Sequence, residues 1–310
     1  MAPLTYHHGQ LSIQAEARTT AVAEHLAGWV GPVTEFARGA DLVLLAAPDE
    51  DQNLRFTVLS GQAPLLEVAV QDGPVVRFPS AFSSRLPIGR CGGLVINLAM
   101  ARRARLNGVI AANDGVYQLA ATETFTLCRK YMAPSIALEA IARLGPDSRQ
   151  MLPLDDPWLA ALLARAETSF LASISPDGGP DVAHRGGPPG FLTLDATNGR
   201  LAWPEYVGDG VFKSAGNLRA TGAFTLLVPD LDTGDAVELV GRGTYTNLRP
   251  ERKMRLDALV QHKEPFPVQG VIESSVQAAY RLTRVLSPRR RIEKALKVTS
   301  CSTVDEQAPR

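Results

Sequence analysis

A glycine-rich stretch in the second half of the chain carries the residues best suited to binding an anion. It reads His184-Arg185-Gly186-Gly187-Pro188-Pro189-Gly190-Phe191 and directly follows a predicted strand. An arginine guanidinium offers a planar fork of donors, and glycine lets backbone N–H groups approach a ligand closely. The stretch predicts a phosphate site, and a glycine-rich turn with a solvated arginine is the alternative interpretation.

A second stretch, residues 203–218, places a lysine, a serine and an asparagine among glycines and aromatic rings. Its sequence is WPEYVGDGVFKSAGNL. Lys213 and Ser214 could complete an oxyanion site, and Trp203, Tyr206 or Phe212 could border a planar ring. A surface loop anchored by its aromatic rings is the competing interpretation.

A third group of polar residues lies on a predicted strand in the first half of the chain. It contains Arg102, Arg103, Arg105 and Asn107. Side chains alternate between the two faces of a strand, so Arg103 and Arg105 should share one face and Arg102 the other. We expect Arg103 and Arg105 to face a ligand cleft, and a charged, exposed strand face that prevents aggregation is the alternative.

Metal binding and thiol chemistry have weaker support in the sequence. Tyr6-His7-His8-Gly9 contains two imidazoles, but adjacent histidines rarely point the same way, so we predict no metal site. Cys128 precedes Arg129 and Lys130, whose charges could make its thiol reactive, although a buried structural cysteine is the more common outcome.

Composition limits the class of protein. The 310 residues suit about two domains, and equal numbers of basic and acidic residues, 32 each, give no overall field toward nucleic acid or an anionic membrane. Three scattered cysteines fit a reducing compartment. No apolar run approaches membrane-spanning length, and the start of the chain lacks a secretory pattern. We therefore expect a cytoplasmic protein with neither nucleic acid nor membrane as a partner.

The elements that must position these groups are mostly strands. Short apolar runs separated by turn residues fill two zones, one from Leu42 to Thr126 and the other from Phe170 to Tyr245. Helical spacing predicts helices at residues 10–29, 135–144, 156–166, 250–261 and 272–286, and a polar tail follows.

The two strand zones have similar residues in the same order, which favours an internal duplication over chance sharing of turns. Four matches support it: Ala47-Pro48-Asp49 with Ser175-Pro176-Asp177 (177 − 49 = 128), Phe78-Pro79 with Trp203-Pro204 (204 − 79 = 125), Gly93-Leu94 with Asn217-Leu218 (218 − 94 = 124), and Leu106-Asn107-Gly108 with Leu239-Val240-Gly241 (241 − 108 = 133).

Several motifs together resemble the pyridoxamine 5′-phosphate oxidase-like, flavin-nucleotide-binding split-barrel family, and its branch with HRGG and WPxY…SxGNL motifs. They are FLASISPDGGPDVAHRGGPPGFLTL, LAWPEYVGDGVFKSAGNL, ELVGRGTY, YHHGQLSIQ, ARRARLNG and CRKY, within Tyr6–Leu248. The resemblance implies a mainly β fold with flanking helices, built as tandem split β-barrels. The expected parts are an N-terminal helical segment (1–39), a degenerate first barrel (40–150), a second barrel with the flavin motifs (151–248), and C-terminal helices with a tail (249–310).

The resemblance also implies a cofactor, flavin mononucleotide (FMN), at an interface between barrels. The residues that carry over are His184, Arg185, Gly186, Tyr206, Lys213, Ser214 and Asn217. Arg103 and Arg105 would reach the flavin's edge or an acidic substrate from the first barrel. Asp209 departs from the family's Asn, and its carboxylate would repel a phosphate.

The function expected from the resemblance is that of an FMN-dependent oxidoreductase that transfers hydride or electrons to an unidentified small substrate. No catalytic side chain is assigned, because the flavin performs the chemistry. NAD(P)H or a separate reductase would be the electron donor, and the chain would be a monomer with paired barrels or a homodimer. The alternative is a non-catalytic flavin or haem carrier or sensor, with His184 as an axial haem ligand.

Overall fold

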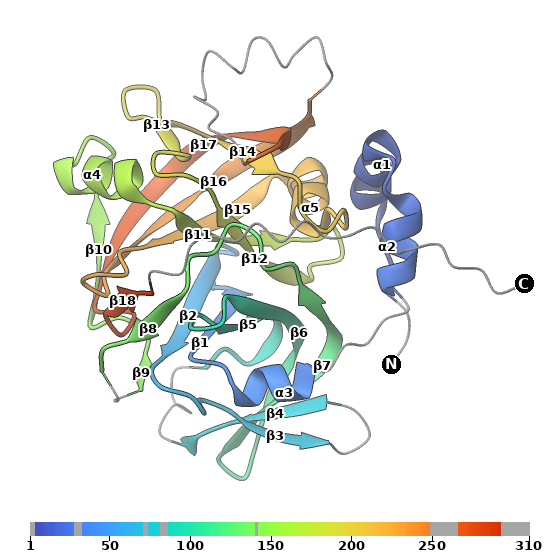
Figure 1. Cartoon of the computed structure of the whole chain (residues 1–310), viewed down its shortest axis with the longest axis vertical. Helices are drawn as coiled ribbons and strands as arrows, with labels where there is room; N and C mark the ends of the chain where they lie inside the picture. The colour runs from blue at the N-terminus through green and yellow to red at the C-terminus, as the bar shows by residue number, and fades with distance from the viewer. Residues whose placement is uncertain are drawn as a thin grey trace, which may run out of the picture.

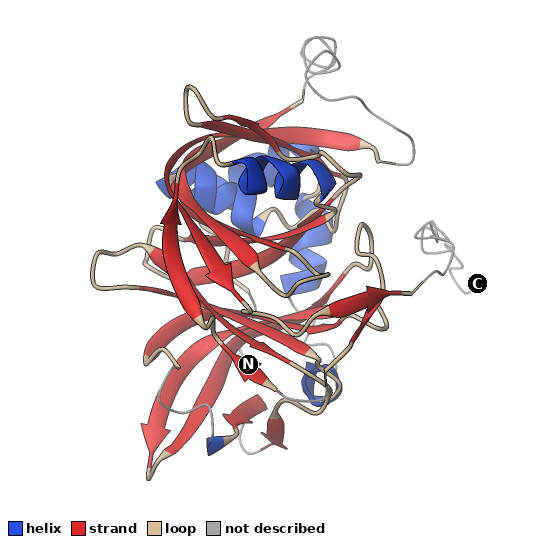
Figure 2. Cartoon of the chain, turned by 90° about the vertical axis from the view of Figure 1, so that its left-hand side faces the viewer, coloured by secondary structure: helices blue, strands red, loops and turns tan. Residues whose placement is uncertain are grey.

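The computed structural model describes residues 4–27, 33–70, 74–80, 86–139, 142–248 and 266–292, which form two large antiparallel sheets and several helices (Figure 1). Figure 2 shows the two curled sheets one above the other. In the first, the strand order is β3 (Glu67–Val70), β4 (Pro74–Phe78), β7 (Val116–Leu127), β6 (Arg102–Asn113), β5 (Gly89–Asn97), β1 (Leu42–Pro48), β2 (Leu54–Ser60) and β9 (Arg143–Leu144).

The second sheet has the order β12 (Pro180–Gly186), β11 (Thr168–Ile174), β15 (Ala223–Pro229), β16 (Ala236–Asn247), β17 (Val268–Thr283), β14 (Arg200–Tyr206) and β13 (Thr193–Asp195), and β10 (Ser148–Leu152) pairs with β17. A small sheet joins β8 (Ser135–Ala137) to β18 (Arg289–Arg291). The helices of the described part are α1 (His8–Ala17), α2 (Thr20–Ala27), α3 (Val33–Arg38), α4 (Pro157–Arg165) and α5 (Lys213–Thr221).

The two large sheets repeat one strand order. Sheet neighbours run β2-β1-β5-β6-β7-β4-β3 in the first and β12-β11-β15-β16-β17-β14-β13 in the second, so each strand has an equivalent at the same place in the chain. The predicted fold class, mainly β with flanking helices in tandem split barrels, is confirmed, and the shared order is what a duplication produces.

A shared irregularity marks the same duplication. The pairing of β6 with β7 shifts register between Asn107 and Gly108, and that of β16 with β17 shifts between Val240 and Gly241. An added Cβ would lie 2.3 Å from the Ala120 carbonyl oxygen at Gly108 and 2.2 Å from the Ser275 carbonyl oxygen at Gly241. Only glycine fits both bulges, so the predicted match at an offset of 133 is confirmed.

Strand registers decide the other predicted matches. Phe78 lies opposite Tyr117 and Trp203 opposite Ile272, which are equivalent positions, so the match at an offset of 125 is confirmed. The match of Gly93-Leu94 with Asn217-Leu218 is wrong. Leu94 lies opposite Arg105 as Leu227 lies opposite Glu238, whereas Asn217 belongs to α5.

The first hairpins give a smaller correction. Leu42 pairs with Ser60 and Thr168 with Gly186, so the offset there is 168 − 42 = 126 and not 128. Pro48 therefore corresponds to Ile174, and the turn containing Pro176 begins two residues later than expected.

Two predicted helices are strands in the structure. Residues 272–286 fall mostly in β17, where buried Ile272, Val276, Ala279 and Leu282 are spaced by three or four residues. The bulge shifts the alternation between Val276 and Ala279, and Leu282 is buried in a different core cluster. This spacing imitates a helix. Residues 135–144 contain β8 and β9, and the basic run Arg289–Arg291 is the strand β18.

The remaining helix predictions have mixed outcomes. The helix over 156–166 is confirmed as α4, whose N-cap Asp156 accepts a hydrogen bond from the Trp158 N–H at 2.8 Å. The long helix over 10–29 is two helices, because Arg18 adopts a left-handed conformation (φ 58°) that ends α1. The predicted helix over 250–261 and the polar tail lie outside the described residues. None of the described helices has the length and apolar character of a membrane span.

The two barrels share a hydrophobic core. One cluster of buried side chains combines Leu44, Leu94 and Ile96 of the first sheet with Phe170, Val182 and Leu227 of the second. Burial of such side chains is the main driving force for association of the two sheets. The barrels are thereby held against each other, and polar residues at the edge of this core can form a site between them.

Candidate functional site

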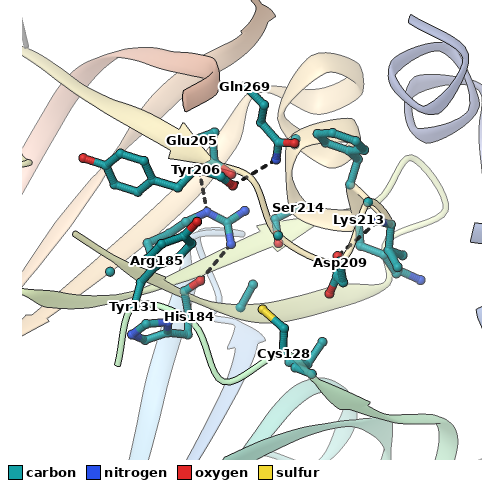
Figure 3. A pocket seen from close by; sticks show the side chains of 18 of the residues that line it. Cys128, Tyr131, His184, Arg185, Glu205, Tyr206, Asp209, Lys213, Ser214 and Gln269 are labelled. Atoms are coloured by element: carbon teal, nitrogen blue, oxygen red, sulfur yellow. Dashed lines mark hydrogen bonds and ion pairs between the residues drawn. The ribbon is translucent and has the colours of Figure 1, made fainter. Parts of the chain in front are cut away.

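A pocket lies at the junction of the two barrels and gathers most of the predicted site residues (Figure 3). Its walls come from β12, from the segment between β14 and α5, from β6, and from the residues after β7. The lining includes Arg103, Arg105, His184, Arg185, Gly186, Tyr206, Lys213 and Ser214, but not Asn217. The cavity measures about 100 Å³, below the roughly 300–1,000 Å³ of typical small-molecule sites.

Arg185, the predicted phosphate-binding arginine, is held by a carboxylate. Its Nε donates to Glu205 Oε1 at 2.5 Å, and its Nη1 donates to the His184 carbonyl oxygen at 3.0 Å. The buried Glu205 also accepts a hydrogen bond from Trp203 Nε1 at 3.1 Å. The Arg185 charge is therefore balanced within the pocket wall.

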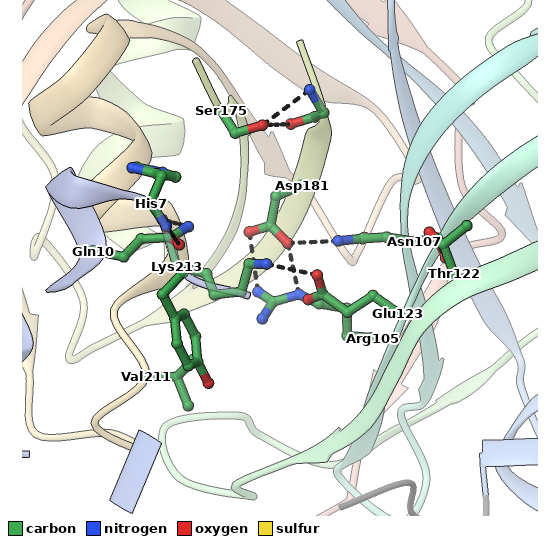
Figure 4. Close-up of polar contacts among 12 residues, drawn as sticks. His7, Gln10, Arg105, Asn107, Thr122, Glu123, Ser175, Asp181, Val211 and Lys213 are labelled. Carbon is green, nitrogen blue, oxygen red and sulfur yellow. Dashed lines mark hydrogen bonds and ion pairs between the residues drawn. The ribbon is translucent and has the colours of Figure 1, made fainter. Parts of the chain in front are cut away.

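Lys213 and Ser214, the other predicted phosphate donors, are also engaged. Lys213 Nζ lies 2.6 Å from Glu123 Oε2 (Figure 4). Ser214 Oγ donates to Asp181 Oδ2 at 3.0 Å. Each predicted phosphate donor thus has a protein carboxylate as its partner. Sequence reasoning missed these pairings because each is decided by packing: Glu123 lies 90 residues from Lys213, and Asp181 lies 33 residues from Ser214.

Asp181 is the centre of a buried network that joins the barrels. Arg105 Nε lies 2.6 Å from its Oδ1, and Asn107 Nδ2 donates to the same oxygen at 3.1 Å. Burial alone would raise the pKa of Asp181. The charges of Arg105 and Lys213 and the hydrogen bonds from Asn107 and Ser214 outweigh burial and lower that pKa. Because Arg105 is ion-paired with Asp181 in this network, it is not free to bind a ligand.

Asn217, predicted to bind the cofactor, joins α5 to the N-terminal helix instead. Its Nδ2 donates to Ser173 Oγ at 3.0 Å, and its Oδ1 accepts from Gln10 Nε2 at 3.1 Å and lies 2.8 Å from His7 Nε2. An added Cβ at Gly216 would lie 2.4 Å from Gln10 Cγ, so α1 and α5 meet at a glycine contact. The YHHGQ and GNL motifs therefore form one packing contact.

Gly186 also has a packing role. An added Cβ there would lie 1.9 Å from the carbonyl oxygen of Tyr131, so only glycine allows β12 to pass the segment after β7. The sequence interpretation assigned this glycine to close approach of a phosphate. The structure gives it a protein neighbour instead.

Arg103 differs from the other cations of the pocket because no carboxylate pairs with it. Only 5% of the residue is exposed, and the ion pairs of the described residues do not include it. Its Nη2 donates to the Lys130 carbonyl oxygen at 3.2 Å and lies 3.9 Å from Cys128 Sγ. Burial lowers the pKa of its guanidinium, and the nearby Cys128 and Asp209 side chains oppose that shift.

The predicted division of the arginines between two faces is confirmed. Arg103 and Arg105 are buried toward the second barrel, whereas Arg102 lies half-buried on the other face, 5.8 Å from the centre of the Phe36 ring. Asp209 lines the same pocket, and its Oδ1 accepts a hydrogen bond from the Val211 N–H at 3.1 Å.

His184 presents a buried nitrogen without a hydrogen-bond partner. The residue is 7% exposed, its ring packs on Phe170, and Nε2 has no partner in the described structure. Burial, followed by the positive charges of Arg103 and Arg185, holds the pKa of His184 well below its usual 6.5. The imidazole is therefore neutral at pH 7.

Tyr131 and Tyr206 line one side of the pocket, and the Phe266 ring packs against both of them. The centre of the Tyr206 ring lies 5.3 Å from those of Tyr131 and Phe266, and the Tyr131 hydroxyl donates to the Val207 carbonyl oxygen at 3.0 Å. Burial raises the pKa of Tyr131 to about 12, so its hydroxyl stays protonated. Tyr206 was predicted. Phe266 was missed because it follows the recognisable motifs.

A second cavity of about 560 Å³ lies beyond Lys213, which lines both (Figure 4). Its walls come from residues 4–10, from β5 to β7 and from the β11–β12 turn. Burial raises the pKa of the Cys91 thiol in its wall to about 12, so this thiol is neutral.

The residues of the first pocket fit a flavin nucleotide in part. The unpartnered Nε2 of His184 and the unpaired Arg103 could both bind such a group. Arg185, Lys213 and Ser214 would have to leave their carboxylate partners first. The fit therefore rests on His184, Arg103 and the aromatic wall rather than on the motif cations.

Comparisons with known proteins give only distant similarities. No family model matches the chain, and no curated protein matches it. Among solved structures, HupZ of Group A Streptococcus is 15% identical (TM-score 0.32), with 40% of this chain covering 90% of HupZ. A Lactobacillus delbrueckii protein, provisionally a pyridoxamine 5′-phosphate oxidase, is 18% identical (TM-score 0.31; coverage 40% and 91%). A Clostridium acetobutylicum protein of the pyridoxinephosphate oxidase family is 10% identical (TM-score 0.29; coverage 43% and 91%).

Proposed function

We propose that the chain binds FMN in the pocket between its barrels and acts as an oxidoreductase on a small molecule. The observation that carries this proposal is the unpartnered Nε2 of the buried His184 in the pocket wall. An unsatisfied buried polar atom costs about 1–3 kcal/mol, which a ligand with a hydrogen-bonding edge would recover. The flavin ring has such an edge, with N–H and C=O groups in a plane.

The chain's own residues would bind and enclose the ring. The neutral His184 can donate or accept one hydrogen bond at Nε2 without adding charge. Tyr131 and Tyr206 would exclude water from one side. Bound flavin supplies the hydride or electron transfer, so no protein residue need act as acid or base. NADH, NADPH or a separate reductase would supply electrons, to a monomer with paired barrels or to a homodimer.

Absorbance of the purified protein, with mass spectrometry of the released ligand, tests this function. FMN should appear as two visible bands that bleach with a suitable electron donor. His184→Ala should weaken FMN binding by about 0.5–1.5 kcal/mol, the net worth of one neutral hydrogen bond. His8→Ala, an exposed histidine outside the pocket, is the matched control. Equal FMN affinities in the two variants would reject the role of His184.

The same observation supports a second candidate, a haem-binding carrier or sensor. A neutral imidazole with a free Nε2 is the form that ligates iron. Haem would give one dominant absorption band in place of the two flavin bands. Loss of that band in His184→Ala, with FMN absent from the released ligands, would replace the flavin proposal with this one.

A further inference from the structure

Helix α5 begins at the pocket without a side-chain cap. Its N-cap residue, Phe212, has a left-handed conformation and makes no side-chain hydrogen bond to the helix. The first helical bond runs from the Gly216 N–H to the Phe212 carbonyl oxygen at 2.8 Å. The N–H groups of Lys213, Ser214 and Ala215 come before it, where a helix offers no internal acceptor. Residues 212–215 line the pocket, so the positive end of the helix lies in its wall.

Two buried side chains in the same pocket also lack the partner that their chemistry calls for. Within the described part of the chain, Arg103 is a buried cation without a carboxylate partner, and the Nε2 atom of His184 has no hydrogen-bond partner. A buried unpaired charge is costly, and an anionic ligand is one means of compensating it. The helix end and these side chains therefore indicate an oxyanion, independently of the motif residues.

Asp209 restricts which oxyanion can bind. It lines the pocket, and its charge acts on Arg103 at longer range than an ion pair. A fixed negative charge beside the site penalises a dianion about twice as much as a monoanion, because the Coulomb energy is proportional to the ligand charge. A carboxylate is a monoanion at pH 7, whereas a phosphate monoester is nearer to a dianion.

We propose that the pocket binds the carboxylate of an organic acid between the N-terminus of α5 and Arg103. Resting on the proposed function, this makes the substrate an acidic molecule. Arg185 and Lys213 do not bind the carboxylate, because Glu205 and Glu123 already hold them. The carboxylate replaces solvent at the helix end and compensates the Arg103 charge.

Calorimetric titration of the full-length protein with benzoate tests the assignment, and neutral benzamide is the matched ligand. Benzoate should bind more tightly than benzamide. Arg103→Met, which keeps side-chain bulk, should weaken benzoate binding by at least about tenfold and leave benzamide unchanged. Arg102→Met, on the other face of β6, should change neither. The same loss in both arginine variants, or equal binding of benzoate and benzamide, would overturn the proposal.

Phosphate ligands distinguish the substrate's carboxylate from the cofactor's phosphate. Inorganic phosphate should bind more weakly than benzoate, and Asp209→Asn should reduce that difference. If Arg103→Met instead weakens FMN but not riboflavin, the oxyanion is the flavin phosphate and the carboxylate assignment is wrong. These titrations need no bound flavin, so a protein that binds benzoate through Arg103 but never FMN would reject the proposed function alone.

Discussion

The internal repeat places two ionic clamps at equivalent positions with opposite polarity. In the clamp beside the pocket, Arg105 of β6 meets Asp181 of β12 and lies over the Phe125 ring at 4.8 Å. At the equivalent positions of the other clamp, Glu238 of β16 lies near Arg55 of β2 (4.0 Å), whose guanidinium faces the Tyr280 ring. Both contacts between barrels therefore use an arginine from the first barrel, an acid from the second, and an aromatic ring.

The positions around the clamps differ more than the clamps themselves. By strand register, His184 corresponds to Val58, Arg185 to Leu59 and Arg103 to Ala236, and the three apolar residues are buried. The equivalent strands of the other repeat thus form with aliphatic side chains at these positions. The fold does not require the imidazole or the two guanidiniums near the pocket, which supports a ligand as the reason for them.

Around the clamp of Glu238 and Arg55, an additional side chain comes from the segment that connects the barrels. Arg149 of β10 stacks on Tyr280 at 3.3 Å and its Nε donates to Glu238 Oε2 at 3.0 Å.

The largest expected effect is on the free energy of unfolding, and it differs between the two clamps because they are buried to different extents. Asp181→Asn should lower the free energy of unfolding by about 3–5 kcal/mol, because it leaves Arg105 buried without an anion. Glu238→Gln should cost less, about 1–3 kcal/mol, because 27% of Arg55 and 31% of Arg149 are exposed and water can solvate them. Urea unfolding measures both. Asp177→Asn, an exposed residue of the β11–β12 turn, should stay within about 1 kcal/mol of wild type.

Equal losses of unfolding free energy in Asp181→Asn and Glu238→Gln would contradict this difference between the clamps. Such a result would mean that Arg55 and Arg149 are as poorly solvated as Arg105.

The second prediction tests whether the two β-bulges are equivalent. Gly108→Ala and Gly241→Ala should each cost about 1–3 kcal/mol, because the new methyl group meets a carbonyl oxygen of the neighbouring strand. Thermal unfolding of the two single variants should give similar losses. A loss at one glycine and none at the other would show that the bulges are not mechanically equivalent.

The smallest effect concerns His184 and pH. Its folded pKa lies well below its unfolded value of about 6.5, so its neutral form contributes stability above pH 6.5 that is lost as pH falls through 6.5. Between pH 7.5 and 5.5 this group should therefore lower the free energy of unfolding of the wild type.

His184→Val, which copies the residue of the first barrel, should lack that part of the pH dependence. Urea unfolding at both pH values measures it, with exposed His8→Val as the control. An unchanged slope in His184→Val would contradict a neutral buried imidazole.

The sequence was informative where a local signal determines the structure. Turn residues predicted most strands, and the glycines at 108 and 241 revealed the repeat because each bulge tolerates no side chain. Strand β17 was misassigned because its bulge spaces the buried residues as in a helix. Alternation on a strand is a local property, so the faces of Arg102 and Arg103 were predictable.

The candidate site was predictable in position but not in chemistry. The motifs placed their residues around one pocket because each lies at the end of a strand of the same barrel or directly after it. Their partners were not predictable: Glu123 lies 90 residues from Lys213, and Asp181 lies 33 residues from Ser214. Only packing between barrels determines that Arg105 meets a carboxylate and Arg103 does not.

The chain between the barrels makes their unfolding a joint event. It contributes β9 to the edge of the first sheet through Leu144 and Leu59, and then β10 to the second through Leu152 and Ala279. Arg289, beyond the second barrel, returns to Asp41 at the start of β1 with Nη2 2.6 Å from Oδ2. Because the repeats share this connecting segment, this ion pair and one hydrophobic core, we expect a single cooperative melting transition despite the duplicated architecture.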